Sequence, residues 1–144
     1  MPNAKFSVQA QSESSSKAII KARNFTLTID EPPNLGGTDH GANPVEFLLA
    51  ALAGCLNVVG HMVAKEMGFT INSLSFELEG ELNPAGFMGK AKDVRPGYQE
   101  IAVKVNADTD ADEETLNKWL EVIESRCPVS DNISNTTSVK IQLK

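Results

Sequence analysis

Cysteine is scarce in this chain, which has only two among its 144 residues, Cys55 and Cys127. Two cysteines do not make the disulfide framework that stabilises small secreted domains. In a reducing compartment they are expected as free thiols, as a redox couple or as inert core residues, because a buried cysteine most often serves as a small hydrophobic side chain. Only a reason to link the two cysteines would make them a candidate site.

Positive charge is also in short supply. The chain has 13 Lys and Arg against 19 Asp and Glu, which gives a net charge of −6 and a pI near 4.9. Nucleic acids and anionic membranes both need a clustered cationic surface on a protein partner. The charge balance therefore argues against either one as the main partner.

Long apolar runs are missing as well. The most apolar stretch, residues 45–59, is shorter than the roughly 20 residues of a bilayer-crossing helix. Residues 1–5 alternate polar and apolar side chains and lack the hydrophobic region of a signal peptide. These absences predict a cytoplasmic protein, and the ordinary content of 41% hydrophobic and 22% charged residues predicts a single globular domain over residues 1–144.

Alternation of polar and apolar residues predicts the strands. Before the glycine-rich loop at residues 35–42 the pattern predicts strands at residues 4–10, 17–23 and 24–30. Further along it predicts strands at residues 71–82, 98–106 and 139–143. Residues 84–97 hold three glycines and two prolines and are predicted to be a loop.

A long helix is predicted between Asn43 and Gly68. Asn43 suits the N-cap, Pro44 the first turn, and Glu46 completes an Asn-x-x-Glu capping box. Gly68 suits the C-cap. Apolar or small residues surround most of the helix, which predicts a buried central helix.

A second helix is predicted after Asp110 or Asp112, either of which can cap it, with a core face made of Leu116, Trp119, Leu120 and Ile123. The segment 126–130 interrupts this helix. The resulting order βββ-α-ββ-α-β, with hairpin-connected strands and helices in separate blocks, predicts an α+β fold with antiparallel sheets.

Two segments carry a resemblance to a known family. In residues 41–55 an Asn43-Pro44 helix start is followed, eleven residues after the proline, by Cys55. The second segment is Arg126-Cys127-Pro128-Val129-Ser130. Together with Leu35-Gly36-Gly37 and the strand order, they resemble the central helix and the Cys-Pro-x-Ser element of the OsmC/Ohr family (osmotically inducible / organic hydroperoxide resistance).

The resemblance implies an interwoven homodimer with the long helices inside and a site at the subunit interface. It implies that Cys55 attacks an organic or inorganic hydroperoxide and that Cys127 resolves the sulfenic acid as a disulfide, which a dithiol reductant recycles in oxidative-stress defence. A second thiol protects the sulfenate from over-oxidation. No cofactor or metal is implied. The alternative is a non-catalytic dimer that binds an apolar small molecule in its interface cavity, with the cysteines as core residues.

The sequence departs from the peroxidase members of this family at the groups that activate the cysteine. Those members pair an arginine of the N-terminal loop with a glutamate directly after the helix proline. Here Val45 takes the glutamate position, and residues 14–17 (Ser-Ser-Ser-Lys) take the place of the arginine. Glu46 lies nine residues before Cys55, on the opposite side of a helix that turns about 100° per residue. The pattern resembles a less characterised OsmC-like branch.

A buried thiol has a raised pKa, so Cys55 needs a nearby cation to react quickly. Arg126, Arg95 and Lys17 are the candidates, although each is also explained as an ordinary surface charge. Cys127 has another route to activation, because a short helix opening at Pro128 would place its sulfur at a helix N-terminus.

The two histidines do not indicate a metal site. His61 lies six residues past Cys55 on a different helix face, and His40 lies in a loop without a partner at ligand spacing. The sequence also contains no P-loop, dinucleotide fingerprint or Gly-x-Ser-x-Gly elbow.

Overall fold

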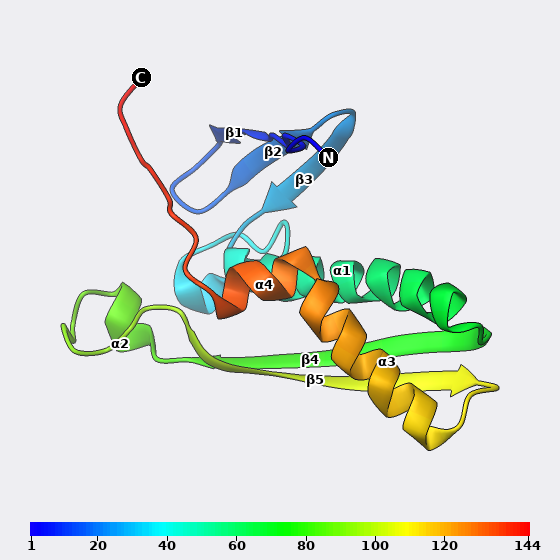
Figure 1. The fold of residues 1–144 in the computed structure, drawn as a ribbon. Helices are drawn as coiled ribbons and strands as arrows, with labels where there is room; N and C mark the ends of the chain where they lie inside the picture. Colours follow the sequence, from blue (N-terminus) through cyan, green and yellow to red (C-terminus); the bar gives the residue numbers. More distant parts are fainter. The chain divides into compact units, whose positions relative to one another are not determined.

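A computed structural model describes residues 1–144, which form two compact units, residues 1–48 and 49–144. The elements along the chain (Figure 1) are β1 (Gln9–Ser12), β2 (Ala18–Ala22), β3 (Phe25–Ile29), the 3-10 turn η1 (Pro33–Leu35), α1 (Pro44–Met67), β4 (Ile71–Leu82), α2 (Pro84–Phe87), β5 (Tyr98–Thr109), α3 (Glu113–Arg126) and α4 (Pro128–Ser134). All strand pairs are antiparallel, so the predicted α+β class is confirmed.

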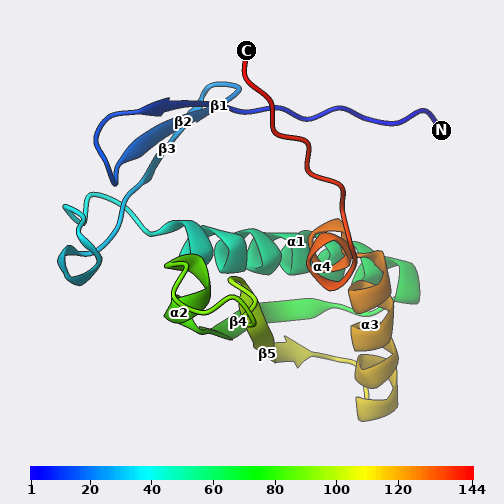
Figure 2. The same ribbon diagram turned by 90° about the vertical axis from the view of Figure 1, so that its left-hand side faces the viewer.

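The first unit holds a three-stranded sheet in the order β1-β2-β3 (Figure 2). The second and third predicted strands lie where the alternation placed them, but the first does not begin at residue 4. Pairing of β1 with β2 starts at Gln9, which lies opposite Lys21. Strand β2 ends at the next residue, Ala22. Residues 4–8 therefore have no neighbouring strand in this sheet, and Phe6 and Val8 are exposed.

Helix α1 begins and ends as predicted. The Asn43 side chain accepts from the Glu46 N–H at 2.9 Å, and the Glu46 carboxylate accepts from the Asn43 N–H at 2.8 Å. Gly68 closes the helix with a φ of 81°, a left-handed conformation that glycine adopts without strain. Burial differs from the prediction, because only one face of α1 is buried and Leu48, Val58 and Met62 are exposed.

The length of α1 also changes one conclusion from the sequence. With 24 residues and a mean hydropathy of 1.9 over its most apolar 18-residue stretch, α1 is long and apolar enough to cross a membrane. The view that the apolar stretch is too short is therefore wrong by length and composition. That criterion is weak, because the core helix of a soluble protein also meets it. Val59, Val63 and Ala64 of α1 lie in a buried core.

The second unit is built on the β4–β5 ribbon, with α1 running along it and α3 crossing α1 (Figure 1, Figure 2). Trp119 of α3 is 1% exposed, and its Nε1–H donates to the carbonyl oxygen of Gly60 at 2.8 Å. A Cβ at residue 60 would lie 3.2 Å from the Trp119 ring. The absence of a side chain at Gly60 therefore lets α3 approach α1 closely.

Three further differences concern element boundaries. Residues 84–97 are not entirely loop, because Asn83 caps the short helix α2, accepting from the Ala85 N–H at 3.0 Å. Strand β5 continues to Thr109. Asp112 is the cap of α3, and Asp110 instead accepts from the Thr70 N–H at 2.8 Å. On the predicted core face of α3, Trp119 and Ile123 are buried, whereas Leu120 is exposed.

The predicted last strand, residues 139–143, is wrong for the isolated chain. The residues after α4 form no strand or helix, and Val139, Ile141 and Leu143 are exposed. A strand exists only where a second strand supplies hydrogen-bond partners, and no segment of this chain pairs with these residues.

Candidate active site

The two cysteines, 72 residues apart in sequence, meet in the second unit. Cys55 lies on α1 and Cys127 lies between α3 and α4, with their Sγ atoms 2.8 Å apart. Both are free thiols. Cys127 is completely buried, whereas Cys55 is partly exposed. The arrangement leaves one sulfur accessible and places the other directly behind it.

Local backbone structure fixes the position of Cys127. Its N–H donates to the Ile123 carbonyl at the end of α3, and its Sγ accepts from the Ser130 N–H at 3.4 Å at the start of α4. Pro128, which has no N–H to donate, occupies the first position of α4. The prediction of a short helix opening at Pro128 is confirmed.

The environment of the sulfurs is apolar. Leu52 and Leu56 of α1 form a buried cluster with Cys127, against which Cys55, Phe76, Leu78, Ile101, Val103, Val129 and Ile133 pack. Burial raises the pKa of the Cys55 thiol above its usual 9.0, and the hydrogen bond with Cys127 raises this pKa further, while the Val129 N–H opposes both. Cys55 is therefore mainly protonated at neutral pH in this arrangement.

The three candidate cations are engaged elsewhere. Arg126 donates to both carboxylate oxygens of Glu66, at 2.5 and 3.1 Å, and to the Met62 Sδ at 3.8 Å. This bond lowers the pKa of Glu66 and raises that of Arg126. Arg95 donates to the Tyr98 carbonyl. Lys17, in the first unit, pairs with Glu13 at 3.3 Å. None of these bonds reaches Cys55.

The remaining residues singled out from the sequence have other surroundings. Glu46 is part of the capping box of α1. His61 is exposed on α1, and the main-chain N–H of His40 donates to Asp30. Nowhere in the chain do three or more His, Cys, Asp or Glu side chains gather in a way that could hold a metal ion.

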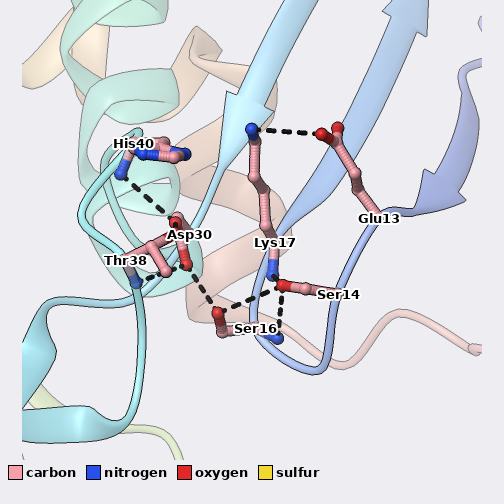
Figure 3. Close-up of polar contacts among 7 residues, drawn as sticks. All are labelled: Glu13, Ser14, Ser16, Lys17, Asp30, Thr38 and His40. Atoms are coloured by element: carbon pink, nitrogen blue, oxygen red, sulfur yellow. Dashed lines mark hydrogen bonds and ion pairs between the residues drawn. The ribbon is translucent and has the colours of Figure 1, made fainter.

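Asp30 is a residue that the sequence reasoning missed. Its carboxylate is completely buried in the first unit and accepts hydrogen bonds from the hydroxyls of Ser16 and Thr38 and from main-chain N–H groups of Thr38 and His40 (Figure 3). The main-chain N–H of Glu31 donates to the same carboxylate. The Thr38 hydroxyl contributes most to holding the pKa of this carboxyl far below its usual value. Ser16 lies before β2, whereas Thr38 and His40 lie after β3, so the donors are not close together in the sequence. No local sequence pattern therefore predicts the set.

An apolar cleft lies beside the thiol pair in the second unit. Its volume is about 450 Å³, and its lining comes from α1, β5, α3 and α4: Leu52, Leu56, Ile101, Val103, Val105, Leu120, Ile123, Glu124, Ser130, Ile133 and Ser134. Leu52 and Leu56 also pack against Cys127. Leu52 and Leu56 therefore belong both to the lining of the cleft and to the cysteine cluster, although neither cysteine lines the cleft.

Fold and site together define an α+β protein with two free cysteines in contact inside an apolar cluster. Residues 37–142 match the family of OsmC-like proteins. Because this match covers most of the chain, the protein belongs to that family. The resemblance seen in the sequence motifs is thus confirmed.

Similar proteins agree with this assignment. The hydroperoxide reductase of Mycoplasma genitalium is 23% identical over 142 residues, which cover 96% of this chain and 94% of that protein. The crystal structure of an OsmC-like protein from Mycoplasma pneumoniae superimposes with a TM-score of 0.80 at 21% identity, over 92% of this chain and 89% of the other. An organic hydroperoxide resistance protein OsmC from Legionella pneumophila gives a TM-score of 0.65 at 19% identity, with 91% of each chain covered. At these identities the solved structures establish the fold alone.

Proposed function

We propose that this protein reduces hydroperoxides with Cys55 as the attacking thiol and Cys127 as the resolving thiol. The observation that carries the proposal is the 2.8 Å separation of the two sulfurs. A partly exposed thiol in front of a buried one is the arrangement that a two-cysteine peroxidase needs, because the first must meet the peroxide and the second must meet only the first.

The reaction balances in three steps. The Cys55 thiolate attacks the distal oxygen of ROOH, the O–O bond breaks, and the alkoxide takes a proton and leaves as ROH. Cys127 then attacks the Cys55 sulfenic acid, which forms the disulfide and releases water. A dithiol reductant finally exchanges with the disulfide, restores both thiols and is itself oxidised.

The relatives and the cleft support this choice. The similar Mycoplasma genitalium protein is named a hydroperoxide reductase, and the Legionella pneumophila structure is that of an organic hydroperoxide resistance protein. The apolar cleft beside Leu52 and Leu56 suits the alkyl part of an organic hydroperoxide. We further propose that the protein works as a homodimer in the cytoplasm. Activation of Cys55 by a cation stays a prediction.

Single-cysteine variants test the proposal. Cys55→Ser should abolish consumption of cumene hydroperoxide in the presence of a dithiol reductant, because no attacking thiol is left. Cys127→Ser should complete about one turnover and then stall or over-oxidise, because only recycling needs the resolver. Stopped-flow measurement of peroxide consumption gives the comparison. Equal consumption by wild type and Cys55→Ser would remove the enzymatic function.

The second candidate is a binding protein for an apolar small molecule. The cleft favours it, because about 450 Å³ accommodates a small ligand and no cysteine takes part in its lining. A fluorescent fatty acid should then bind equally well to wild type and to Cys55→Ser, with native thiols that are inert to peroxide. Peroxide-reactive thiols would favour the first candidate.

A further inference from the structure

Two adjacent residues at the junction of α3 and α4 contact α1 at widely separated points. Cys127 meets Cys55, whereas the Arg126 side chain extends to Met62 and Glu66. Cys55 and Glu66 are eleven residues apart on one helix, about 16 Å along its axis at 1.5 Å per residue. At 100° per residue they differ by only about 20° in direction, so they share one face of α1.

We propose that the Arg126–Glu66 ion pair positions Cys127 for its attack on oxidised Cys55. This inference rests on the proposed thiol chemistry and assigns Arg126 a role other than activating Cys55. The ion pair and the sulfur contact reach α1 at points about 16 Å apart along its axis, so together they constrain both the position and the rotation of the junction over α1. Loss of the ion pair removes one of the contacts that hold the junction on α1, so the Cys127 sulfur should meet Cys55 in the reactive geometry less often.

Burial in the apolar cluster and the bonds to Ile123 and Ser130 hold Cys127 locally, and the ion pair adds a side-chain contact with α1 at a distant point. Cys127 departs from helical geometry, with ψ at 112°, and Pro128 has no N–H to donate. The nearest anchor of α3 on α1 through a hydrogen bond is Trp119, two turns earlier, at Gly60. The Arg126–Glu66 contact is bidentate, a geometry that fixes direction as well as distance.

The consequence falls on the second chemical step. Attack of the Cys127 sulfur on the Cys55 sulfenic acid forms the S–S bond and breaks the S–O bond, and the hydroxyl leaves as water with the Cys127 proton. This step requires the Cys127 sulfur to approach in line with the S–O bond. The first step, cleavage of the peroxide by Cys55, needs no contact from the ion pair, and a looser contact with Cys127 lowers the Cys55 pKa rather than raising it. Glu66→Gln and Arg126→Gln should therefore slow disulfide formation without slowing peroxide cleavage.

The size of the effect follows from exposure. The side chains of Arg126 and Glu66 are 40% and 52% exposed, so solvent weakens their attraction. We expect disulfide formation to slow by about two- to fivefold in either variant. The charge-swapped double variant Glu66→Arg/Arg126→Glu should recover most of the rate. Glu121→Gln is the matched control, because it breaks the exposed Lys118–Glu121 pair on the same α3 helix away from the junction.

Two measurements make the test. Quenched-flow mass spectrometry with one equivalent of cumene hydroperoxide separates loss of the Cys55 thiol from appearance of the disulfide. Equilibration with reduced and oxidised glutathione measures the stability of the Cys55–Cys127 disulfide without peroxide. Glu66→Gln and Arg126→Gln should lower this equilibrium constant by about two- to fivefold, Glu121→Gln should not, and the swap should restore it.

The outcomes separate the two proposals. An unchanged equilibrium constant in both variants, an equal loss in Glu121→Gln, or a swap no better than the single variants would overturn the positioning role. Slower peroxide cleavage in Arg126→Gln would overturn it too, because Arg126 would then activate Cys55. A wild type that ignores the peroxide but shows the expected glutathione constants would remove the peroxidase function and leave the positioning role standing.

Discussion

The Sγ of Cys127, at the junction of α3 and α4, lies 2.8 Å from the Sγ of Cys55 on α1. A disulfide bond of about 2.05 Å needs the two sulfurs to approach by less than 1 Å. The Cys127 thiol is completely buried, whereas Cys55 is partly exposed, so a peroxide from solvent can reach Cys55 but not Cys127. This relationship is the basis of the proposed chemistry.

The first prediction concerns assembly. The apolar side chains of residues 139–143 and the exposed face of α1 have no partner in one chain, and both favour association. Light scattering after gel filtration should give twice the 15.5 kDa mass of one chain. Ile141→Glu should shift the mass toward the monomer, whereas the neighbouring Gln142→Glu should not. A monomeric wild type at micromolar concentration would contradict the prediction.

The second prediction concerns pH. Because burial raises the pKa of Cys55 above 9.0, the reactive thiolate becomes more abundant as pH rises through and beyond this value. Alkylation of Cys55 by iodoacetamide should therefore still accelerate at pH 9. Cys127→Ala removes a hydrogen bond that raises this pKa, so the midpoint should move to lower pH. A plateau already reached below pH 8 would show that a cation stabilises the thiolate.

The third prediction compares two glycines of α1. Gly54→Ala meets no atom within 4 Å and should stabilise the helix by about 0.5–1 kcal/mol. Gly60→Ala would place its Cβ against the Trp119 ring and should destabilise the fold by about 1 kcal/mol or more. Urea unfolding followed by the fluorescence of Trp119, the only tryptophan, measures both. A stabilised Gly60→Ala variant would contradict the close approach of α3 and α1.

The fourth prediction concerns Asp30. Asp30→Asn turns one acceptor oxygen into a donor that faces buried N–H and hydroxyl groups, so it should lower the urea midpoint. Glu13→Gln is the control, since it removes only the exposed pair with Lys17 in the same unit. Equal midpoints for the two variants would contradict a structural role of Asp30.

The pH dependence of this effect has a definite sign. The pKa of Asp30 is held below its usual 3.8 in the folded chain, so its contribution is complete above that value and is lost as pH falls below it. The difference between wild type and Asp30→Asn should thus stay constant from pH 7 to about pH 5 and shrink in more acidic solution. Urea unfolding at each pH gives this difference.

The features that the sequence predicted well are formed by residues that lie close together in the chain. The Asn43–Glu46 capping box and the alternation of residues 71–82 involve neighbours in the chain, and the structure has them as expected. The predicted strand at residues 139–143 is absent because alternation of polar and apolar residues shows only that a segment suits a sheet. It does not show that a partner strand is available. The Arg126–Glu66 ion pair joins residues 60 apart, and two ordinary surface charges give no sign in sequence that the fold brings them together.

The most direct test of the cysteine couple is its oxidation product. Reduced wild-type protein should be treated with one equivalent of cumene hydroperoxide and digested under non-reducing conditions, with folding followed by the fluorescence of Trp119. We predict one disulfide-linked peptide pair that contains Cys55 and Cys127, loss of both free thiols, and an unchanged folded signal. Separate sulfinic or sulfonic products on the two cysteines, or two thiols that remain free, would contradict the account.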